Sequence, residues 1–220
     1  MCIADALCVA GASCIDAFET KRLSRPLNLS DSDIRALGSG EILVRDDMLP
    51  MAEVRAGAMA LDVIEASRRL RPAGFGHQGR RDPSLRGDRT TWVGDVDDAA
   101  LLKLRVFFED VRLELNSSVW LGLASFTIQL AHFPGAGTRY VKHHDALAGD
   151  PTRRATAILY LNPDWVPSDG GCLRVDPPSG QHDLQPLGGR LVVFLSDKVA
   201  HEVLPCHTAR RAATAWYQRY

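Results

Sequence analysis

The sequence predicts an α+β fold in which N-terminal helices brace a β-sandwich or β-barrel. Amphipathic helical patterns occupy the first half of the chain, whereas short β-type runs broken by Gly, Pro and Asp follow Ser125. Helices and strands that are segregated along a chain are typical of α+β domains. The expected strands span residues 126–133, 139–143, 156–161, 172–175, 191–195, 201–204 and 212–217.

The first half contains one further strand, at residues 41–45, and two helices. Asp46 and Asp47 can cap the first helix and Pro50 fits its first turn. An apolar stripe at three- and four-residue steps marks this helix: Met51, Val54, Ala58, Leu61 and Ile64. A second helix is expected over residues 97–115, with its own apolar face.

The ends of these elements carry further signals. Arg68, Arg69 and Arg71 suit the C-terminal end of the first helix, because cations there complement the helix dipole, and Pro72 is expected to stop it. Residues 74–88 are rich in Gly, Arg and His and predict a long loop, a feature that is often functional.

Residues 1–40 differ in character and are expected to form an N-terminal extension or leader helix. Residues 30–33 offer N-caps for a short helix that Gly38 would end. We therefore expect one domain over residues 41–220, with its β core at about 125–220.

Composition limits the class of protein. The 220 residues are 45% hydrophobic and 24% charged, with a formal net charge of −1, so no general attraction to nucleic acid or to anionic membrane is expected. No apolar run reaches the length of a membrane helix. The five cysteines lack zinc-type spacing, and we expect free thiols in a cytoplasmic protein.

A metal site is indicated at the end of one expected strand. Residues two apart on a strand point to the same face, so His143 and Asp145 project together. His201, at the start of a later strand, can supply a third ligand. Two imidazoles and one carboxylate form the facial triad of non-haem Fe(II) oxygenases. An H-x-D pair alone is a weak signal, and cupin-type sites use similar ligands.

An anion site is indicated on the last expected strand. Arg210 and Thr214 share one of its faces, and a guanidinium with a hydroxyl suits a buried carboxylate. Tyr160, on an otherwise apolar strand, can add a phenol to the same anion.

Ordered motifs then carry a resemblance to a known family. They are RGDRTTW at 86–92, FPGAGTRYVKHHD at 133–145, YLNPDW at 160–165, GGCLR at 170–174, FLSD at 194–197, HEV at 201–203 and RRAATAWY at 210–217. This set resembles the prolyl 4-hydroxylase branch of the 2-oxoglutarate oxygenases, in particular the animal hypoxia-inducible-factor prolyl hydroxylases and their bacterial relatives. The resemblance covers roughly residues 41–220.

The resemblance implies a double-stranded β-helix (jelly roll) and a set of site residues. By matching position, Fe(II) would be held by His143, Asp145 and His201. Arg210 would bind the distal carboxylate of 2-oxoglutarate with help from Tyr160 and Thr214, while Ile158 and Trp216 would wall the pocket. O2 is the other co-substrate, succinate and CO2 are products, and ascorbate is the expected reductant.

One departure and three substrate residues complete the expectations. The family's animal members commonly carry tyrosine where Phe133 stands, so altered co-substrate affinity is expected. Arg153 matches an arginine near the substrate entrance of the family, and Asp88 could pair with it across the site. Arg86, from the arginine-rich loop, completes the three expected substrate residues. The resemblance implies a protein substrate with a target proline, such as elongation factor Tu for bacterial relatives, and a loop at residues 75–89 that closes over it.

Two alternatives remain open. The same chemistry could act on a free amino acid or another small metabolite. A non-catalytic jelly-roll module that only binds metal belongs to a different class, and it leaves the expected 2-oxoglutarate residues without a use.

Overall fold

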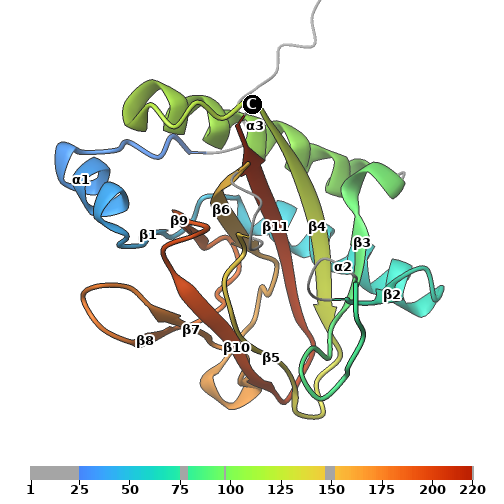
Figure 1. Ribbon diagram of the computed structural model, residues 1–220. Helices are drawn as coiled ribbons and strands as arrows, with labels where there is room; N and C mark the ends of the chain where they lie inside the picture. Colours follow the sequence, from blue (N-terminus) through green and yellow to red (C-terminus); the bar gives the residue numbers. More distant parts are fainter. Residues whose placement is uncertain (1–24, 75–78, 97, 147–151, 220) are drawn as a thin grey trace, which may run out of the picture.

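The computed structural model describes residues 25–74, 79–96, 98–146 and 152–219 (Figure 1). Three of the cysteines (Cys2, Cys8 and Cys14), most of the expected N-terminal extension, residues 75–78 of the expected loop and the first residue of the second expected helix lie outside these ranges. Cys172 and Cys206, the two cysteines within them, are free thiols as expected.

The α-helices come before most of the strands, as the sequence predicts. The helices are α1 (Asp31–Ser39), α2 (Met51–Ala66) and α3 (Ala99–Val119), with short 3₁₀ turns η1 (Val93–Asp95) and η2 (Pro167–Asp169). The strands are β1 (Leu43–Arg45), β2 (Arg71–Pro72), β3 (Arg89–Trp92), β4 (Ser125–Phe133), β5 (Thr138–His143), β6 (Arg153–Tyr160), β7 (Leu173–Asp176), β8 (His182–Leu184), β9 (Leu191–Leu195), β10 (Ala200–Cys206) and β11 (Arg210–Gln218).

The strands form two antiparallel sheets. The larger has seven strands in the order β1-β9-β6-β11-β4-β3-β2, and the smaller has four in the order β5-β10-β7-β8. Strands that are distant in sequence are neighbours in both sheets, and the helices flank the larger sheet (Figure 1). The expected α+β class is confirmed. No helix in the described ranges combines the length and the apolar character needed to cross a membrane.

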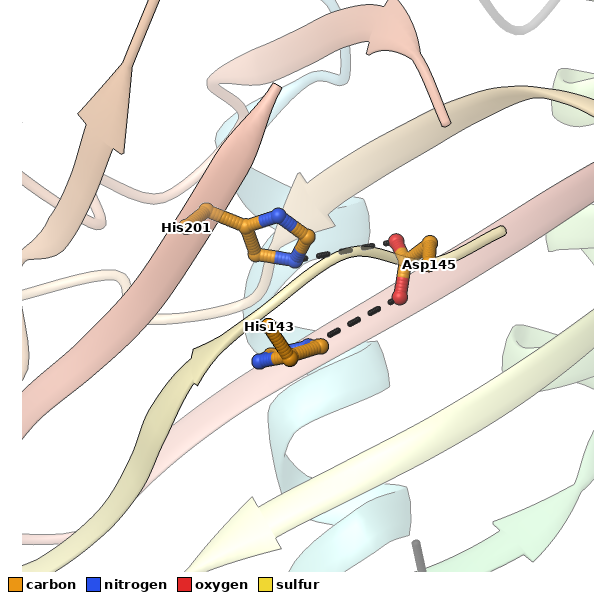
Figure 2. A group of neighbouring side chains, drawn as sticks. All are labelled: His143, Asp145 and His201. Atoms are coloured by element: carbon orange, nitrogen blue, oxygen red, sulfur yellow. Dashed lines mark ion pairs between the residues drawn. The ribbon is translucent and has the colours of Figure 1, made fainter. Parts of the chain in front are cut away.

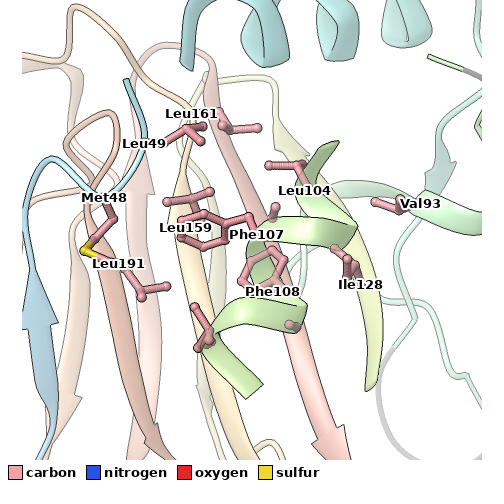
Figure 3. Close-up of a cluster of buried hydrophobic side chains, with 14 of the residues drawn as sticks. Met48, Leu49, Val93, Leu104, Phe107, Phe108, Ile128, Leu159, Leu161 and Leu191 are labelled. Atoms are coloured by element: carbon pink, nitrogen blue, oxygen red, sulfur yellow. The ribbon is translucent and has the colours of Figure 1, made fainter. Parts of the chain in front are cut away.

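Alternation along the central strands divides the core into two layers. On β6, Ala157 and Leu159 pack with the helices on one face of the larger sheet, whereas Ile158 and Tyr160 point between the two sheets. Phe107 and Phe108 of α3 fill the helical layer and lie fully buried near Leu159 (Figure 3). The layer between the sheets is where the polar site residues lie.

Several expected boundaries are wrong, for local reasons. α2 has no side-chain cap: Pro50 precedes it, Asp46 pairs instead with Arg190 at 2.6 Å, and Asp47 adopts a left-handed φ of 55°. α2 also ends at Ala66, before the three arginines, so these do not lie in its last turn.

Pro72 does not stop a helix, because it lies in β2, which pairs with β3. α1 runs past Gly38 and ends at Gly40, whose φ of 96° is easily adopted only by glycine. The short strands β2, β3 and β8 were not expected, since few residues in them alternate between polar and apolar.

Candidate active site

Two strands of the smaller sheet bring the expected metal ligands together. His143, the last residue of β5, is the direct cross-strand partner of His201 on β10, and Asp145 follows two residues after β5. The carboxylate oxygens of Asp145 lie 3.7 Å from His143 Nε2 and 3.7 Å from His201 Nε2. Figure 2 shows the three side chains converging, and their ligand atoms all lie within 4.8 Å of one another.

Backbone carbonyls hold both imidazoles in an orientation that suits metal binding. His143 Nδ1 lies 2.8 Å from the carbonyl oxygen of Val141, and His201 Nδ1 lies 3.2 Å from that of Val199. A carbonyl only accepts, so each Nδ1 carries the proton and each Nε2 keeps a lone pair. The lone pairs therefore face Asp145, as a metal site requires.

The charge states of the ligands also suit a cation. Burial raises the pKa of Asp145, but the nearby His201 and His143, together with hydrogen bonding to the carboxylate, lower it, and the net pKa lies below its usual value. Burial and the proximity of His201 lower the pKa of His143 well below its usual value. The site thus offers an ionised carboxylate and a neutral imidazole, the forms that bind metal.

A stack of side chains supports His143 from the side. The ring of Tyr140 lies 3.7 Å from that of His143 with an interplanar angle of 22°, and the guanidinium of Arg86 lies 4.4 Å from the Tyr140 ring centroid. Arg86 pairs with the buried Asp88 at 2.8 Å and donates to Gln129 at 2.9 Å. The expected pairing of Asp88 with Arg153 is wrong, because both carboxylate oxygens of Asp88 accept from Arg86.

Arg153 is instead fixed beside the metal ligands. Its Nη1 donates to the backbone carbonyl of Asp145 at 2.8 Å, and its guanidinium lies 4.3 Å from the Trp216 ring centroid. Trp216 also packs edge-on against Trp92, with ring centroids 5.9 Å apart.

Arg210, at the start of β11, is a buried cation. The residue is only 4% exposed, and its Nε donates a hydrogen bond to the carbonyl oxygen of Gly171 at 2.8 Å. The guanidinium lies 5.1 Å from the ring centroids of both Phe133 and Tyr160. Within the described ranges no carboxylate forms an ion pair with Arg210, and the buried hydroxyl of Tyr160 has no hydrogen-bond partner there.

These residues border one small cavity between the sheets, with a volume of about 50 Å³. Its walls include the following residues that the sequence indicated: Arg86, Asp88, Phe133, His143, Asp145, Ile158, His201, Arg210 and Thr214. Tyr160 lies behind the wall beside Arg210, and Trp216 stands next to Arg153. Two larger hollows elsewhere on the surface border none of the three metal ligands.

Sequence reasoning missed several residues that shape the site. Tyr140, Ser196 and Gly171 were expected only as members of motifs, and Thr156 and Gln129 were not expected to take part. Thr156 could have been found, because it lies two residues before Ile158 and so shares its face of β6. Ser196 and Gly171 come from other elements, and no local pattern connects them to Asp145 or Arg210.

The donor set fits Fe(II). Two imidazoles and one carboxylate on one side of a site, next to a cavity, match the facial triad that leaves positions open for a co-substrate and O2. The buried cation of Arg210 in this cavity, and the Tyr160 phenol beside it that has no hydrogen-bond partner among the described residues, suit a carboxylate ligand.

Comparisons of sequence agree with this site. The sequence-family model described as the 2OG-Fe(II) oxygenase superfamily matches residues 128–218. Human prolyl hydroxylase EGLN3 is 36% identical over 141 residues, which are 60% of this chain and 59% of the human protein. The hypoxia-inducible factor prolyl hydroxylase of Caenorhabditis elegans is 46% identical over 143 residues, 60% of this chain and 20% of that protein. The chain thus spans less than two thirds of these curated relatives.

Solved structures give the same result over more of the chain. A prolyl-4-hydroxylase from Pseudomonas putida is 34% identical with a TM-score of 0.75, over 85% of this chain and 97% of that one. A Trichoplax adhaerens prolyl hydroxylase in complex with a hypoxia-inducible factor peptide has a TM-score of 0.77 at 24% identity, over 84% of this chain and 86% of that one, and shows the shared fold.

These neighbours have the jelly-roll fold of the 2-oxoglutarate oxygenases, which confirms the expected double-stranded β-helix. Three findings agree. They are the family match, the similarity that extends over 97% of the bacterial enzyme, and the cluster of His143, Asp145 and His201. The chain belongs to the 2OG-Fe(II) oxygenase superfamily, in its prolyl 4-hydroxylase branch.

Proposed function

We propose that this chain is an Fe(II)- and 2-oxoglutarate-dependent dioxygenase that hydroxylates a prolyl residue in a protein. The observation that carries the proposal is the presence, in one cavity, of a three-residue metal cluster and a buried arginine without a carboxylate partner among the described residues. A metal-binding module has no need of that arginine, since burying an unpaired cation is costly.

His143, Asp145 and His201 hold the metal. When bound, Fe(II) together with 2-oxoglutarate and O2 supplies the oxidising power that inserts oxygen into a C–H bond, with release of succinate and CO2. The part of the protein is to hold the cation, orient the substrate and exclude water. Apolar walls from Ile158, Leu173 and Val203 border the cavity and limit the access of water to it.

Arg210 binds the distal carboxylate of 2-oxoglutarate. Its Nε is already used on Gly171, so the two Nη groups remain to form a fork toward an anion. The hydroxyls of Tyr160 and Thr214 add donors, and Phe133 contributes a ring without a hydroxyl. Burial raises the pKa of Tyr160, so its phenol stays protonated and can donate.

Arg153 and Trp216 form one side of the substrate entrance. Arg153 contacts the backbone of a metal ligand and stacks on Trp216, so a substrate that touches either residue lies close to the metal. Arg86 and Asp88 border the cavity as a closed ion pair, and they shape its mouth.

A protein substrate is supported by the relatives. The Trichoplax enzyme was solved with a hypoxia-inducible factor peptide. Elongation factor Tu, with a target proline in its switch region, is the first candidate for this chain. A free amino acid or small metabolite is the competing class.

The test measures succinate and peptide mass in the same reaction. The Fe(II)-loaded protein is incubated in air with 2-oxoglutarate, ascorbate and a proline-bearing switch-region peptide of elongation factor Tu. The control peptide has alanine in place of the target proline, and a third reaction contains free proline. We expect succinate together with one added oxygen atom on the proline peptide only.

Other outcomes separate the alternatives. Hydroxylation of free proline in preference to the peptide would favour the small-metabolite class. Absence of succinate in all reactions, from protein that retains metal, would contradict the oxygenase activity and favour a binding module. The Asp145→Ala variant controls for oxidation by iron in solution.

A further inference from the structure

Two buried hydroxyls connect β6 and the end of β9 to the carboxylate of Asp145. Thr156 Oγ1 donates to Asp145 Oδ2 at 2.8 Å, and Ser196 Oγ lies 2.9 Å from Thr156 Oγ1. Both residues are 0% exposed, so water does not compete for these hydrogen bonds. None of the expected site residues included them.

The direction of the two hydrogen bonds follows from the donors available. An ionised carboxylate only accepts, so the single hydroxyl proton of Thr156 is committed to Asp145. The bond between the two hydroxyls therefore takes its proton from Ser196. The result is a one-way chain in which Ser196 donates to Thr156 and Thr156 donates to Asp145 Oδ2.

This chain of hydrogen bonds makes the two carboxylate oxygens of Asp145 unequal, although both lie equally far from a histidine. Oδ1 of Asp145 lies 3.7 Å from His143 Nε2, and Oδ2 lies the same 3.7 Å from His201 Nε2. Only Oδ2 accepts a hydrogen bond from Thr156. That bond withdraws electron density from Oδ2 and leaves Oδ1 as the better donor to a cation.

The backbone around Asp145 is already fixed, which makes the side-chain torsion the remaining freedom. Arg153 Nη1 donates to the Asp145 carbonyl at 2.8 Å, and the Ala146 amide donates to the Ser196 carbonyl at 3.1 Å. With the backbone held on both sides, rotation of the carboxylate about its own bond decides whether Oδ1 points to the metal. The hydrogen bond from the Thr156 hydroxyl opposes this rotation.

We propose that Thr156, oriented by Ser196, is a positioning residue that holds Asp145 as a one-oxygen ligand through Oδ1. Groups that hydrogen-bond metal ligands set their orientation, and loss of such a group lowers metal affinity by about 10- to 100-fold. The proposal rests on the metal site of the proposed function. It does not depend on the identity of the substrate.

The test is the affinity of the metal-free protein for Mn(II), measured by calorimetry without 2-oxoglutarate or peptide. Thr156→Val keeps the shape of the side chain and removes the hydroxyl, and we expect a fall of about 10- to 100-fold. Thr156→Ser restores the hydroxyl and should recover most of the affinity. Ser196→Ala should give a smaller fall than Thr156→Val, because it removes only the orienting donor.

Thr91→Val is the matched control. Thr91 also lies on a strand, and it neither lines the cavity nor takes part in the hydrogen bonds to Asp145. The Mn(II) affinity of the Thr91→Val variant should equal that of the unaltered protein. Thermal unfolding of each metal-free variant separates folding from positioning: a positioning role predicts that the increase in Tm on adding Mn(II) shrinks for Thr156→Val and returns for Thr156→Ser.

Two results would overturn the proposal. Equal Mn(II) affinity for Thr156→Val and the unaltered protein would remove the positioning role while leaving the metal site intact. Equal losses in Thr156→Val and Thr156→Ser would show that packing, and not the hydroxyl, matters. If Thr156→Val does not fold, unchanged affinity in Ser196→Ala contradicts the chain of donors. An unaltered protein that binds no Mn(II) would instead refute the proposed function.

Discussion

Arg210 carries a charge inside the protein that its described neighbours do not neutralise. Its guanidinium is buried between two aromatic rings, and its nearest hydrogen-bond partner is a backbone carbonyl. A buried cation of this kind is costly unless a ligand supplies the counter-charge. At the residue scale, this arginine is the group that we propose binds the distal carboxylate of 2-oxoglutarate.

Arg210→Ala should weaken 2-oxoglutarate binding and leave the metal in place. Hydrogen bonds to charged groups contribute about 1.5–3 kcal/mol, so the Kd for 2-oxoglutarate should rise about 10- to 100-fold. Calorimetric titration of the Mn(II)-loaded protein checks this. Arg211→Ala is the matched control, because Arg211 points to the other face of β11 and pairs with Asp62. An unchanged Kd in Arg210→Ala would exclude its role.

Gly171→Ala should act on the co-substrate through Arg210. Gly171 has a φ of +74°, and an added Cβ would lie 2.8 Å from Arg210 Cδ and 2.9 Å from Cys206 Sγ. Arg210 must shift to make room, so 2-oxoglutarate affinity should fall. Gly180→Ala is the control, since Gly180 has a φ of +111° but open space around it. Gly180→Ala introduces the same kind of backbone strain and should lower only the stability of the protein. If both variants lowered 2-oxoglutarate affinity equally, the role given to Gly171 would be contradicted.

At the scale of elements, α1 depends on a capping box whose carboxylate also holds β1. Ser30 and Asp33 exchange backbone and side-chain hydrogen bonds, and Arg45 of β1 pairs with Asp33 at 2.8 Å. The Ser30 hydroxyl and amide, with Arg45, lower the pKa of Asp33 to about 2. The folded-state pKa thus lies below that of the unfolded chain, so the ionised form stabilises the fold.

Asp33→Asn should therefore cost stability in a pH-dependent way. At neutral pH the loss should be about 1 kcal/mol, the usual contribution of a helix cap. The stabilisation by Asp33 is complete above the unfolded pKa and is lost as pH falls through about 2, so the difference between the proteins should shrink over that range. Urea denaturation at a series of pH values measures it. A difference that stays constant down to pH 2 would contradict this origin.

α3 contributes two large, fully buried side chains to the helical layer. Phe107 and Phe108 are fully buried and pack edge to face at 5.1 Å. Phe107→Ala should lower the free energy of unfolding by about 3–5 kcal/mol, because it removes buried surface and leaves a cavity. Leu113→Ala, on the exposed face of α3, should change it by at most about 0.5 kcal/mol. If urea denaturation showed similar losses of unfolding free energy for Phe107→Ala and Leu113→Ala, the buried face of α3 would not be what holds the helix in place.

The strands of the core were largely predictable from sequence because alternation reports burial on two faces. β9 matches its expected bounds, and β4 and β5 begin one residue early. Helix ends were less predictable, since Asp46 is drawn away from a capping role by Arg190, a residue far along the chain. Short strands such as β8 form only because a neighbouring strand offers hydrogen bonds.

The residues of the site also divide into those that the sequence could identify and those that it could not. His143, Asp145 and Arg210 could be identified because an H-x-D pair at the end of a strand and an arginine on the last strand have a direct chemical meaning. The partner of Asp88 could not, because the choice between Arg86 and Arg153 depends on how β3 and β6 are placed in the sheet. Thr156 and Ser196 meet Asp145 only through the packing of two sheets.

At the scale of the whole molecule, the fold places a metal cluster on the smaller sheet opposite an arginine on the larger one. His143 and His201 come from β5 and β10, whereas Arg210 and Thr214 come from β11. The jelly roll thus brings metal and co-substrate groups to one cavity from both sheets. Neither sheet alone contains the complete site.

The central claim, that this cavity couples 2-oxoglutarate breakdown to hydroxylation, is tested most directly by the ratio of two products. Succinate and hydroxyproline are counted in one reaction of the Fe(II)-loaded protein with 2-oxoglutarate, O2 and the proline peptide. We predict one succinate for each hydroxyproline in the unaltered protein, and neither product above background in Asp145→Ala. Hydroxyproline formed without 2-oxoglutarate, or unchanged product formation in Asp145→Ala, would contradict the account.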